Sequence, residues 1–520
     1  MSIPPKHRID AVIPTPGHAP PPMRRFFIDC TKTYFFGGST GIQRVVTECA
    51  AHAEAAGQDV GVRCVPVVWA GTGFIELGGN RVEAPFLSRL LCTGLRRMFV
   101  HLRRVGKQWF PRRASMRTVE KVDPPRTHTL PSPNLATALA AGAMYFVLSW
   151  LALPGSWLRF RFPRFHANDV LILPDANWGN LIPTNVLEEV QQFGTKLVCV
   201  MHDILPVRIP ETFEAELVAR FDAWLKWACR HVDAMVCVSH STQTDLQNYF
   251  AEQFLANPPC LGTFRLGCNP RLDKAGPRPQ IVQELELIGR RPWLLCVGTL
   301  EPRKNHDLLL DACERLWDSG RLFGLVFVGR IGWRSERLIN RIAQHPHLRH
   351  WLHVYHDLSD SELDLAYEGA TGVVMPSLAE GLGLPVIEAL MHNKPVIASD
   401  IPPHRETGQD HCLFFAPDDE TELCDCISKL LDGQHQRPIL ANEDMRLPDW
   451  NTSVRELLQE VDRLLPHEHD RTVPNHVLTT KFGKHRDRNI ARGPKEVSSA
   501  HTPCLQPSGG KPERPNQKVA

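Results

Sequence analysis

One stretch of the chain, VVMPSLAEGLGLPVIEALMHNKPVIASD at residues 373–400, restricts the fold more than any other. A buried strand at 372–375 is followed by a glycine-rich turn at 380–384. A helix then opens at Pro385, where proline is favoured because its missing N–H would be unbonded at that position. A second apolar strand follows at 395–399. Strand, turn, helix and strand in this order predict a βαβ unit of an α/β fold.

The helix start in this unit is suited to an anion, because free backbone N–H groups and the positive end of the helix dipole meet there. Glu380 and Glu388 bracket the turn. Carboxylates do not bind phosphate, so these two would accept hydrogen bonds from hydroxyls on either side of it. A nucleotide sugar has that form, with a diphosphate between a sugar and a ribose. The alternative is a structural strand-to-helix turn with two solvated glutamates, since such turns are common.

The string EGLGLPVIEA resembles the E-x7-E signature of the retaining glycosyltransferases of family 4. The resemblance implies the GT-B fold, in which two Rossmann-like, doubly wound α/β domains face each other across a cleft. It also implies that Glu380 contacts the donor sugar and that Glu388 contacts the ribose of the nucleotide. The donor-binding turn would consist of Gly381, Leu382, Gly383 and Leu384.

A second string, GTLEPRKN at 298–305, is similar to the family loop that grips the donor diphosphate. Arg303 can bind an anion through two N–H groups, and Lys304 supplies a compact positive charge. Two adjacent basic residues are otherwise commonly a solvated surface. The resemblance implies donor contacts for these two residues and for Gly298. It implies a base-binding role for the loop around Arg330.

A third string, HDILPVRIPETF at 202–213, follows the strand KLVCVM and is similar to a family segment whose histidine lies beside the donor sugar. His202 is therefore expected at the donor or transition state, and a general base is one role for it. An N-cap role for Asp203 is equally compatible with the sequence. Near the N-terminus, TGIQRVV resembles the opening of bacterial family members and makes Gly38 and Gly41 donor-site candidates. A tight turn without a ligand is the alternative there.

By this resemblance, Glu380, His202, Arg303 and Lys304 are the expected catalytic residues. The barrier in such a transfer is the departure of an anionic diphosphate from an oxocarbenium-like sugar, so fixed positive charge is the main requirement. Two cations and a helix end can supply it without a metal. No His/Asp cluster in the sequence has evident metal-ligand spacing, so neither a metal nor another cofactor is expected beyond the nucleotide-sugar co-substrate.

Composition excludes several classes of protein. The 520 residues are too many for one core, and a formal net charge of +2 gives no nucleic-acid footprint. The 15 cysteines are an odd number without paired spacing and lie mostly in apolar runs, as expected for a reduced cytoplasmic protein. The first 22 residues lack an apolar core, so no secretory signal is expected.

The α/β pattern is interrupted at residues 86–165. Eight Arg or Lys and no Asp or Glu occur at 86–113, and 19 uncharged residues follow at 135–153. We expect a helical insertion that docks on the cytoplasmic membrane surface, or else a hairpin packed on the protein. The predicted segments are a disordered N-terminus at 1–23, a first domain at 24–268, a linker at 269–290, a nucleotide-sugar domain at 291–448, a helix at 449–465 that returns to the first domain, and a disordered basic tail at 466–520.

The expected activity is transfer of a sugar from a nucleotide sugar to a saccharide or lipid-linked saccharide acceptor. Similarity to bacterial family members suggests GDP-mannose or a related deoxysugar donor, and a lipid-linked polysaccharide or O-antigen acceptor. Two alternatives are a GT-B nucleotide-sugar epimerase or hydrolase, which would use the same donor site, and a non-catalytic scaffold. A scaffold would normally lose one of the acidic or basic site residues, and all four are present in this chain.

Overall fold

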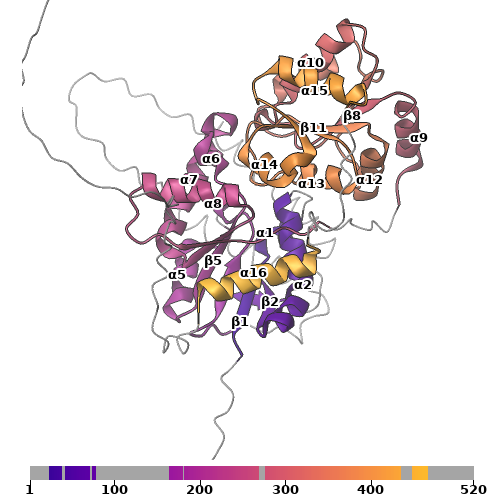
Figure 1. Ribbon diagram of the computed structural model, residues 1–520. Coiled ribbons are helices and arrows are strands. Elements are labelled where there is room, and N and C mark those ends of the chain that lie inside the picture. Colours follow the sequence, from indigo (N-terminus) through magenta and orange to yellow (C-terminus); the bar gives the residue numbers. More distant parts are fainter. Residues whose placement is uncertain are drawn as a thin grey trace, which may run out of the picture. The chain divides into compact units, whose positions relative to one another are not determined.

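The computed structural model describes residues 23–37, 41–70, 73–77, 163–179, 181–268, 276–434 and 448–466. Two sheets with helices packed on them make up this part of the chain, in agreement with the predicted α/β class (Figure 1). Most of the expected insertion, the apolar run at 135–153 and both terminal segments lie outside these residues. None of the helices in the described ranges is long and apolar enough to cross a bilayer.

Each sheet and the helices packed on it are called a lobe, the first lobe being built on the first sheet. The first sheet has seven strands in the order β3-β2-β1-β4-β5-β6-β7. Only β3 is antiparallel to its neighbour. The strands are β1 Arg25–Asp29, β2 Arg63–Trp69, β3 Phe74–Glu76, β4 Val170–Leu173, β5 Lys196–Met201, β6 Ala234–Cys237 and β7 Cys260–Thr263. The helices of this lobe are α1 Thr31–Phe36, α2 Gly41–Val60, α5 Thr184–Gln192, α6 Leu205–Arg208, α7 Ala215–His231 and α8 His240–Glu252, with short 3-10 turns η1 Asn177–Gly179 and η2 Pro210–Thr212.

The second sheet has six parallel strands in the order β10-β9-β8-β11-β12-β13. They are β8 Trp293–Val297, β9 Gly324–Val328, β10 Leu352–Tyr355, β11 Gly372–Met375, β12 Val396–Ser399 and β13 Cys412–Phe415. The remaining helices are α9 Pro279–Ile288, α10 His306–Asp318, α11 Glu336–Ala343, α12 Asp360–Gly369, α13 Leu384–Met391, α14 Pro402–Gly408, α15 Glu420–Leu431 and α16 Trp450–Leu464, with 3-10 turns η3 Pro302–Lys304 and η4 Gln409–His411.

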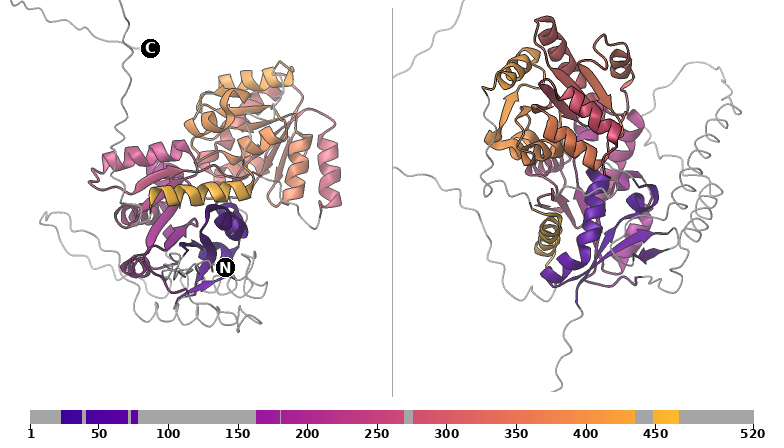
Figure 2. Two further views of the ribbon diagram at one scale, coloured as in Figure 1. Left: turned by 60° about the horizontal axis from the view of Figure 1, so that its bottom comes forward. Right: turned by 90° about the vertical axis from the view of Figure 1, so that its right-hand side faces the viewer.

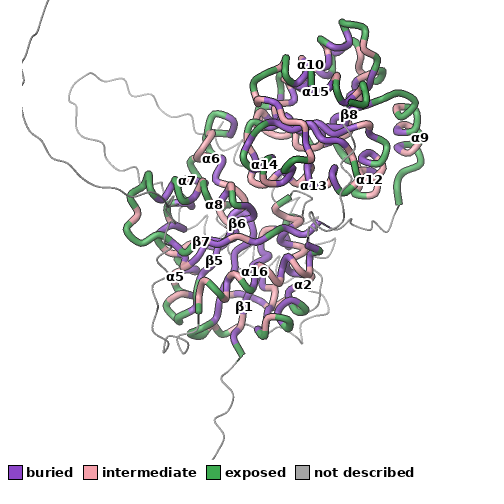
Figure 3. Tube along the Cα trace, viewed as in Figure 1, coloured by how far each residue is buried: buried purple, intermediate pink, exposed green. Residues whose placement is uncertain are grey.

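Both sheets are covered on two faces, which explains why their strands are continuous apolar runs. Successive residues of a strand point to opposite faces. Accordingly Phe26 and Ile28 of β1 join one core cluster with α2, whereas Phe27 joins another with α5 and α7. The second sheet divides in the same way, with α10 and α15 on one face and α9, α12 and α13 on the other. The strands are accordingly drawn mostly as buried in Figure 3.

Helix α16 returns to the first lobe, as the sequence predicts. Its apolar face, which includes Trp450, Val454 and Leu457, packs into the same core as α2 and β1 (Figures 1 and 2). The guanidinium of Arg24 forms an ion pair with Asp462, and the Ser453 hydroxyl donates to the carbonyl of Arg265. These contacts make the C-terminal helix of the described chain a structural part of the first lobe.

The segment expected to be a linker contains a helix. Helix α9 lies within 269–290, and its two buried residues, Ile281 and Leu285, pack with Trp293 and Tyr367 of the second lobe. The charge and proline content of this segment suggested a solvated connection. Apolar side chains spaced four residues apart nevertheless fall on one helix face, and that face is buried.

Helix α12, which leads into β11, begins with a capping box that offers a test of the local fold. The Ser359 hydroxyl accepts from the backbone N–H of Glu362, and the Glu362 carboxylate accepts from the N–H of Ser359. Ser359→Ala is therefore expected to lower the free energy of unfolding by about 1 kcal/mol in urea. Ser359→Gly is the matched control and should cost only a few tenths of a kcal/mol. Equal losses for both variants would contradict a capping role.

Candidate active site

The loop after β8 brings two cations to the carboxyl edge of the second sheet. Pro302 starts the 3-10 turn η3, and Asn305 ends it in the left-handed conformation at φ 55° before α10 begins. Gly298, at the end of β8, has φ 157°. A Cβ there would lie 3.2 Å from Lys304 Cε. Because Gly298 has no side chain, the lysine can lie across the strand end.

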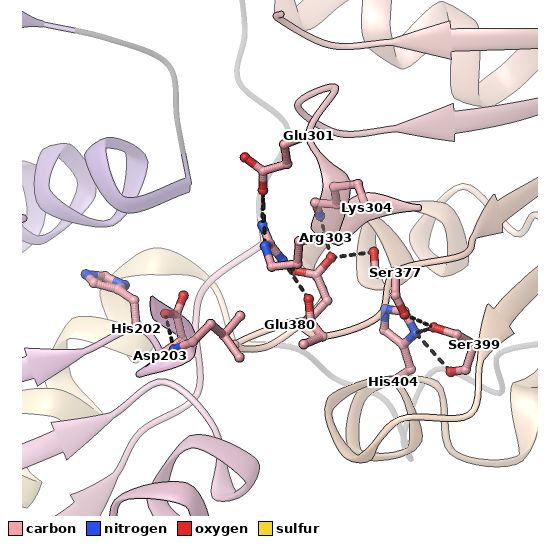
Figure 4. A network of polar contacts seen from close by, with 12 residues as sticks. His202, Asp203, Glu301, Arg303, Lys304, Ser377, Glu380, Ser399 and His404 are labelled. Carbon is pink, nitrogen blue, oxygen red and sulfur yellow. Dashed lines mark hydrogen bonds and ion pairs between the residues drawn. The ribbon is translucent and has the colours of Figure 1, made fainter. Parts of the chain in front are cut away.

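Arg303 and Lys304 converge on the carboxylate of Glu380 (Figure 4). Arg303 Nη1 donates to Glu380 Oε2 at 2.7 Å, and Lys304 Nζ donates to Glu380 Oε1. The Ser377 hydroxyl donates to the same Oε1 at 2.7 Å. Arg303 also donates from Nη2 to Glu301 Oε1 at 2.6 Å. The side chains of Arg303, Lys304 and Glu380 are all largely buried. Lys304 and Glu380 lie 76 residues apart in the sequence.

The charges in this network set its protonation. Burial alone would raise the pKa of the Glu380 carboxyl, but the neighbouring Arg303 and Lys304 hold that pKa well below its usual range. Glu380 is therefore ionised at neutral pH. Burial raises the pKa of Glu301, the second acid beside Arg303, although that guanidinium opposes the effect. The site thus holds the side chains of Arg303 and Lys304 against one strongly acidic carboxyl and one weaker acid.

The glycine-rich turn follows Glu380 directly and leads into α13, which begins at Leu384, one residue before the predicted start. Gly383 precedes it in the left-handed conformation at φ 92°. A Cβ on Gly381 would come within 2.1 Å of the carbonyl oxygen of His202, so only glycine fits there. The Ser239 hydroxyl donates to the Gly381 carbonyl at 2.6 Å. The turn is thus held by backbone and hydroxyl contacts next to the His-Asp segment.

Glu388 lies in the second turn of α13, and both of its carboxylate oxygens accept hydrogen bonds. Arg44 Nη1 donates to Oε1 at 2.8 Å, and the Tyr367 hydroxyl donates to Oε2 at 2.9 Å. Burial, opposed by Arg44, raises the pKa of Glu388. Sequence reasoning did not single out either partner, although Arg44 is the arginine of the TGIQRVV string.

His202 and Asp203 follow β5, at the carboxyl end of the first sheet. His202 Nε2 lies 2.8 Å from the carbonyl oxygen of Pro174, so Nε2 carries the hydrogen and Nδ1 is the acceptor. Burial lowers the pKa of His202, which favours the neutral ring. Asp203 Oδ1 accepts from the N–H of Leu205, the first residue of α6, but the N-cap residue of this helix is Ile204, so Asp203 lies one residue before the expected position.

The structure therefore brings together Arg303, Lys304, Glu380 and the turn that follows, with Gly298 beneath the lysine. Gly41 begins α2, and a Cβ there would lie 3.6 Å from Leu384 Cδ1. Gly38 lies outside the described residues. The carbonyl of Arg330 accepts from the N–H of Leu300, which places its loop beside the loop of the two cations.

Sequence reasoning missed four groups that complete the network: Glu301, Ser377, Ser399 and His404 (Figure 4). Glu301 stands inside the GTLEPRKN string, so its position was visible. The ion pair of Glu301 with Arg303 could not be read from the sequence. Among the residues that the structure describes, no cluster of three or more His, Cys, Asp or Glu could hold a metal ion.

Parts of this chain are similar in sequence to a known protein family and to individual characterised proteins. Residues 277–444 match the family model described as glycosyl transferases group 1. The serotype-specific mannosyltransferase WbdA of Escherichia coli is 31% identical over 312 residues, which is 58% of this chain and 38% of that protein. The O-antigen chain mannosyltransferase RfbU of Salmonella typhimurium is 27% identical over 222 residues, which is 42% of this chain and 56% of that one. The matches thus span about two fifths to just over half the length of these relatives.

Among solved structures, the sucrose-phosphate synthase of Thermosynechococcus elongatus superposes with a TM-score of 0.52 at 16% identity, covering 85% of this chain and 99% of that one. At this identity the likeness concerns the fold alone. It agrees with two Rossmann-like sheets in one chain. Residues 277–444 therefore match the glycosyl transferases group 1 family, and the chain that carries them has the GT-B fold.

Proposed function

We propose that this chain is a glycosyltransferase that moves a sugar from a nucleotide-sugar donor to a saccharide acceptor in the synthesis of a cell-surface polysaccharide. The observation that carries the proposal is the convergence of buried Arg303 and Lys304 on Glu380, directly before the turn that opens α13. The names of the similar mannosyltransferases support the same class of reaction.

The site suits the departure of a diphosphate. In the reaction, the bond from the anomeric carbon to the phosphate oxygen breaks, and negative charge develops on that oxygen. Preorganised positive charge at this position stabilises the transition state more than the ground state. Arg303, Lys304 and the N–H groups at 381–384 would provide it. Because these groups already supply several donors, we propose that the reaction needs no metal.

We further propose that the anomeric configuration is retained. The acceptor hydroxyl would attack from the face that the diphosphate leaves, and the departing phosphate oxygen would take the hydroxyl proton. Glu380 would keep the two cations in place and orient the sugar. GDP-mannose is the proposed donor, because the relatives are mannosyltransferases by name. A lipid-linked acceptor and contact of 86–165 with the cytoplasmic membrane surface belong to the same proposal.

A panel of nucleotide sugars tests the proposed function. UDP-, GDP- and dTDP-sugars are each added to the full chain, and both thermal stabilisation and nucleotide release are measured. At least one should raise the midpoint of thermal unfolding, because a ligand that binds the folded state stabilises it. Absence of binding by the whole panel would overturn the proposal. Donor turnover at full rate without any acceptor would indicate an epimerase or hydrolase instead.

Tyr367→Phe tests the expected contact of Glu388 with the nucleotide. The substitution removes the hydroxyl that holds Glu388 Oε2 and leaves the rest of the ring in the core. Because a bond to a carboxylate is worth about 1.5–3 kcal/mol, a partial loss of donor affinity should raise KM roughly 5- to 10-fold. Turnover at saturation should stay within about two-fold, since binding away from the reacting atoms is uniform.

Tyr355→Phe is the matched control, because the Tyr355 hydroxyl donates to Glu284, away from this network. Its KM for the donor should equal that of the wild type. A fall in turnover without a change in KM for Tyr367→Phe would contradict a binding role for Glu388.

A further inference from the structure

Helix α8 of the first lobe begins with backbone N–H groups that are bonded by the second lobe. The first four N–H groups of an α-helix have no partner inside the helix. In α8, the N–H of Thr242 donates to the hydroxyl of Ser239, which is the N-cap residue. The N–H groups of His240 and Ser241 donate instead to the two carboxylate oxygens of Glu406, at 2.8 and 2.9 Å. The first lobe by itself therefore leaves the start of α8 only partly bonded.

The carboxylate of Glu406 reaches the first lobe from α14. It also accepts from the Ser241 hydroxyl at 2.8 Å. Among the described residues, all the hydrogen bonds of this carboxylate come from His240 and Ser241. A negative charge at a helix N-terminus is favoured by the helix dipole as well as by the N–H groups. Glu406 is thus a link between α14 and α8.

The same helix start is bonded to the turn at 381–384, which is proposed to hold the donor. The hydroxyls of Ser239 and Thr242 lie 2.6 and 3.1 Å from the carbonyl oxygen of Gly381. The Thr242 hydroxyl is also 3.3 Å from the carbonyl oxygen of His202. A Cβ on Gly381 would lie 2.1 Å from that His202 oxygen, so the donor turn touches the segment that begins at His202. One turn of α8 therefore bonds both segments of the site.

The contact of α8 with the second lobe sets the distance between the two sides of the site. Arg303, Lys304 and the donor turn belong to the second lobe, whereas His202 belongs to the first. The second lobe alone can hold the nucleotide through its own cations and N–H groups. The reaction needs both sides in register, because a misplacement of about 1 Å can cost about 100-fold in rate.

We infer that Glu406 is a positioning residue, which holds the start of α8 against the second lobe and so fixes the donor turn beside His202. The inference rests on the proposed function. Glu406 acts through α8 and Gly381 and not on the substrate. Its loss should therefore slow the reaction and leave the binding of the nucleotide to the second lobe intact.

Glu406→Gln tests the role in the reaction. The glutamine has nearly the same size, but it carries no charge and its amide nitrogen cannot accept a hydrogen bond. The experiment measures kcat and KM with GDP-mannose, or with the nucleotide sugar of the panel that the wild type uses, and the affinity for the free nucleoside diphosphate. We expect kcat to fall roughly 10-fold, because hydrogen bonds to a charged group are lost. Affinity for the nucleoside diphosphate should stay within about two-fold of the wild type.

Hydrogen exchange followed by mass spectrometry tests the contact itself and needs no donor. Peptides that cover the start of α8 should exchange faster in Glu406→Gln, because the N–H groups of His240 and Ser241 lose a partner. Glu368→Gln, which changes an exposed glutamate of α12, is the matched control. It should equal the wild type in exchange, in kcat and in nucleotide affinity.

Ser241→Ala approaches the same contact from the first lobe. It removes the hydroxyl that donates to Glu406 and keeps the backbone N–H. The variant should show a smaller fall in kcat than Glu406→Gln, again without a change in nucleotide affinity. Combined with Glu406→Gln it should add little, because both substitutions weaken one contact.

Two results would overturn the inference. If the start of α8 exchanges at the wild-type rate in Glu406→Gln, the carboxylate does not hold it. If nucleotide affinity falls by the same factor as kcat/KM, Glu406 supports only the donor site inside the second lobe. A wild type that uses no nucleotide sugar of the panel would overturn the proposed function, and the positioning role with it. The exchange result distinguishes these failures, because it reports the contact whether or not a donor is turned over.

Discussion

Lys304→Ala is expected to lower the turnover of the donor roughly 100-fold or more, because one preorganised charge at a developing anion is worth about 2.7–4 kcal/mol. The side chain is 10% exposed, lies across Gly298 and ends on Glu380. Among the described residues, no other lysine forms an ion pair with Glu380. The effect is measured as the rate of nucleotide release from the donor that the panel of nucleotide sugars identifies.

Lys429→Ala is the matched control for this prediction. Lys429 is an exposed lysine in the last turn of α15, so its loss should leave turnover unchanged. Turnover by Lys304→Ala within a few fold of wild type would remove the lysine from the reaction. A circular dichroism spectrum equal to that of the wild type is required of both variants, so that a lost fold is not taken for a lost charge.

Glu380→Gln is expected to reduce both turnover and stability. The glutamine can still accept from Ser377, but it leaves Lys304 without a negative partner in a buried site and leaves Arg303 with Glu301 alone. Removing one member of a buried ion pair typically costs about 3–5 kcal/mol of folding free energy. The cations would also lose their fixed positions, so turnover should fall roughly 100-fold. Urea unfolding and donor turnover at pH 7 measure the two effects.

The pH dependence of stability distinguishes the charge of Glu380 from its shape. Its pKa is lowered in the folded state, so its contribution to stability is complete above the usual glutamate pKa of about 4.3 and is lost as pH falls through the folded value. The difference in unfolding free energy between wild type and Glu380→Gln should therefore be smaller at pH 3.5 than at pH 7. A constant difference would mean that the carboxylate charge does not stabilise the fold.

Much of the fold could be predicted from the sequence because it is encoded by short-range patterns. Continuous apolar runs predicted β1, β5, β8 and β11, and proline and glycine positions predicted the start of α13 to within one residue. The linker prediction differs from the structure at α9. Its buried face has only two apolar side chains, Ile281 and Leu285, and the charges around them concealed it.

The site was predictable in its members but not in its pairings. Arg303, Lys304 and Glu380 were named from strings that resemble a family, and the structure brings them together. The resemblance predicted that Arg303 and Lys304 bind the donor diphosphate and that Glu380 contacts the donor sugar. In the structure the three side chains bind one another, and Glu301 and Ser377 complete the set.

The sequence by itself determined the βαβ unit at 372–399, the turn at 380–384 within it and the identity of the charged groups. These depend on backbone preferences and periodicities that act over a few residues. Only the tertiary structure decided that Glu380 neutralises two buried cations and that Glu406 bonds the start of α8. Charge interaction and hydrogen-bond satisfaction depend on distance and burial, and these exist only once parallel strands bring loops from distant parts of the chain to one edge of a sheet.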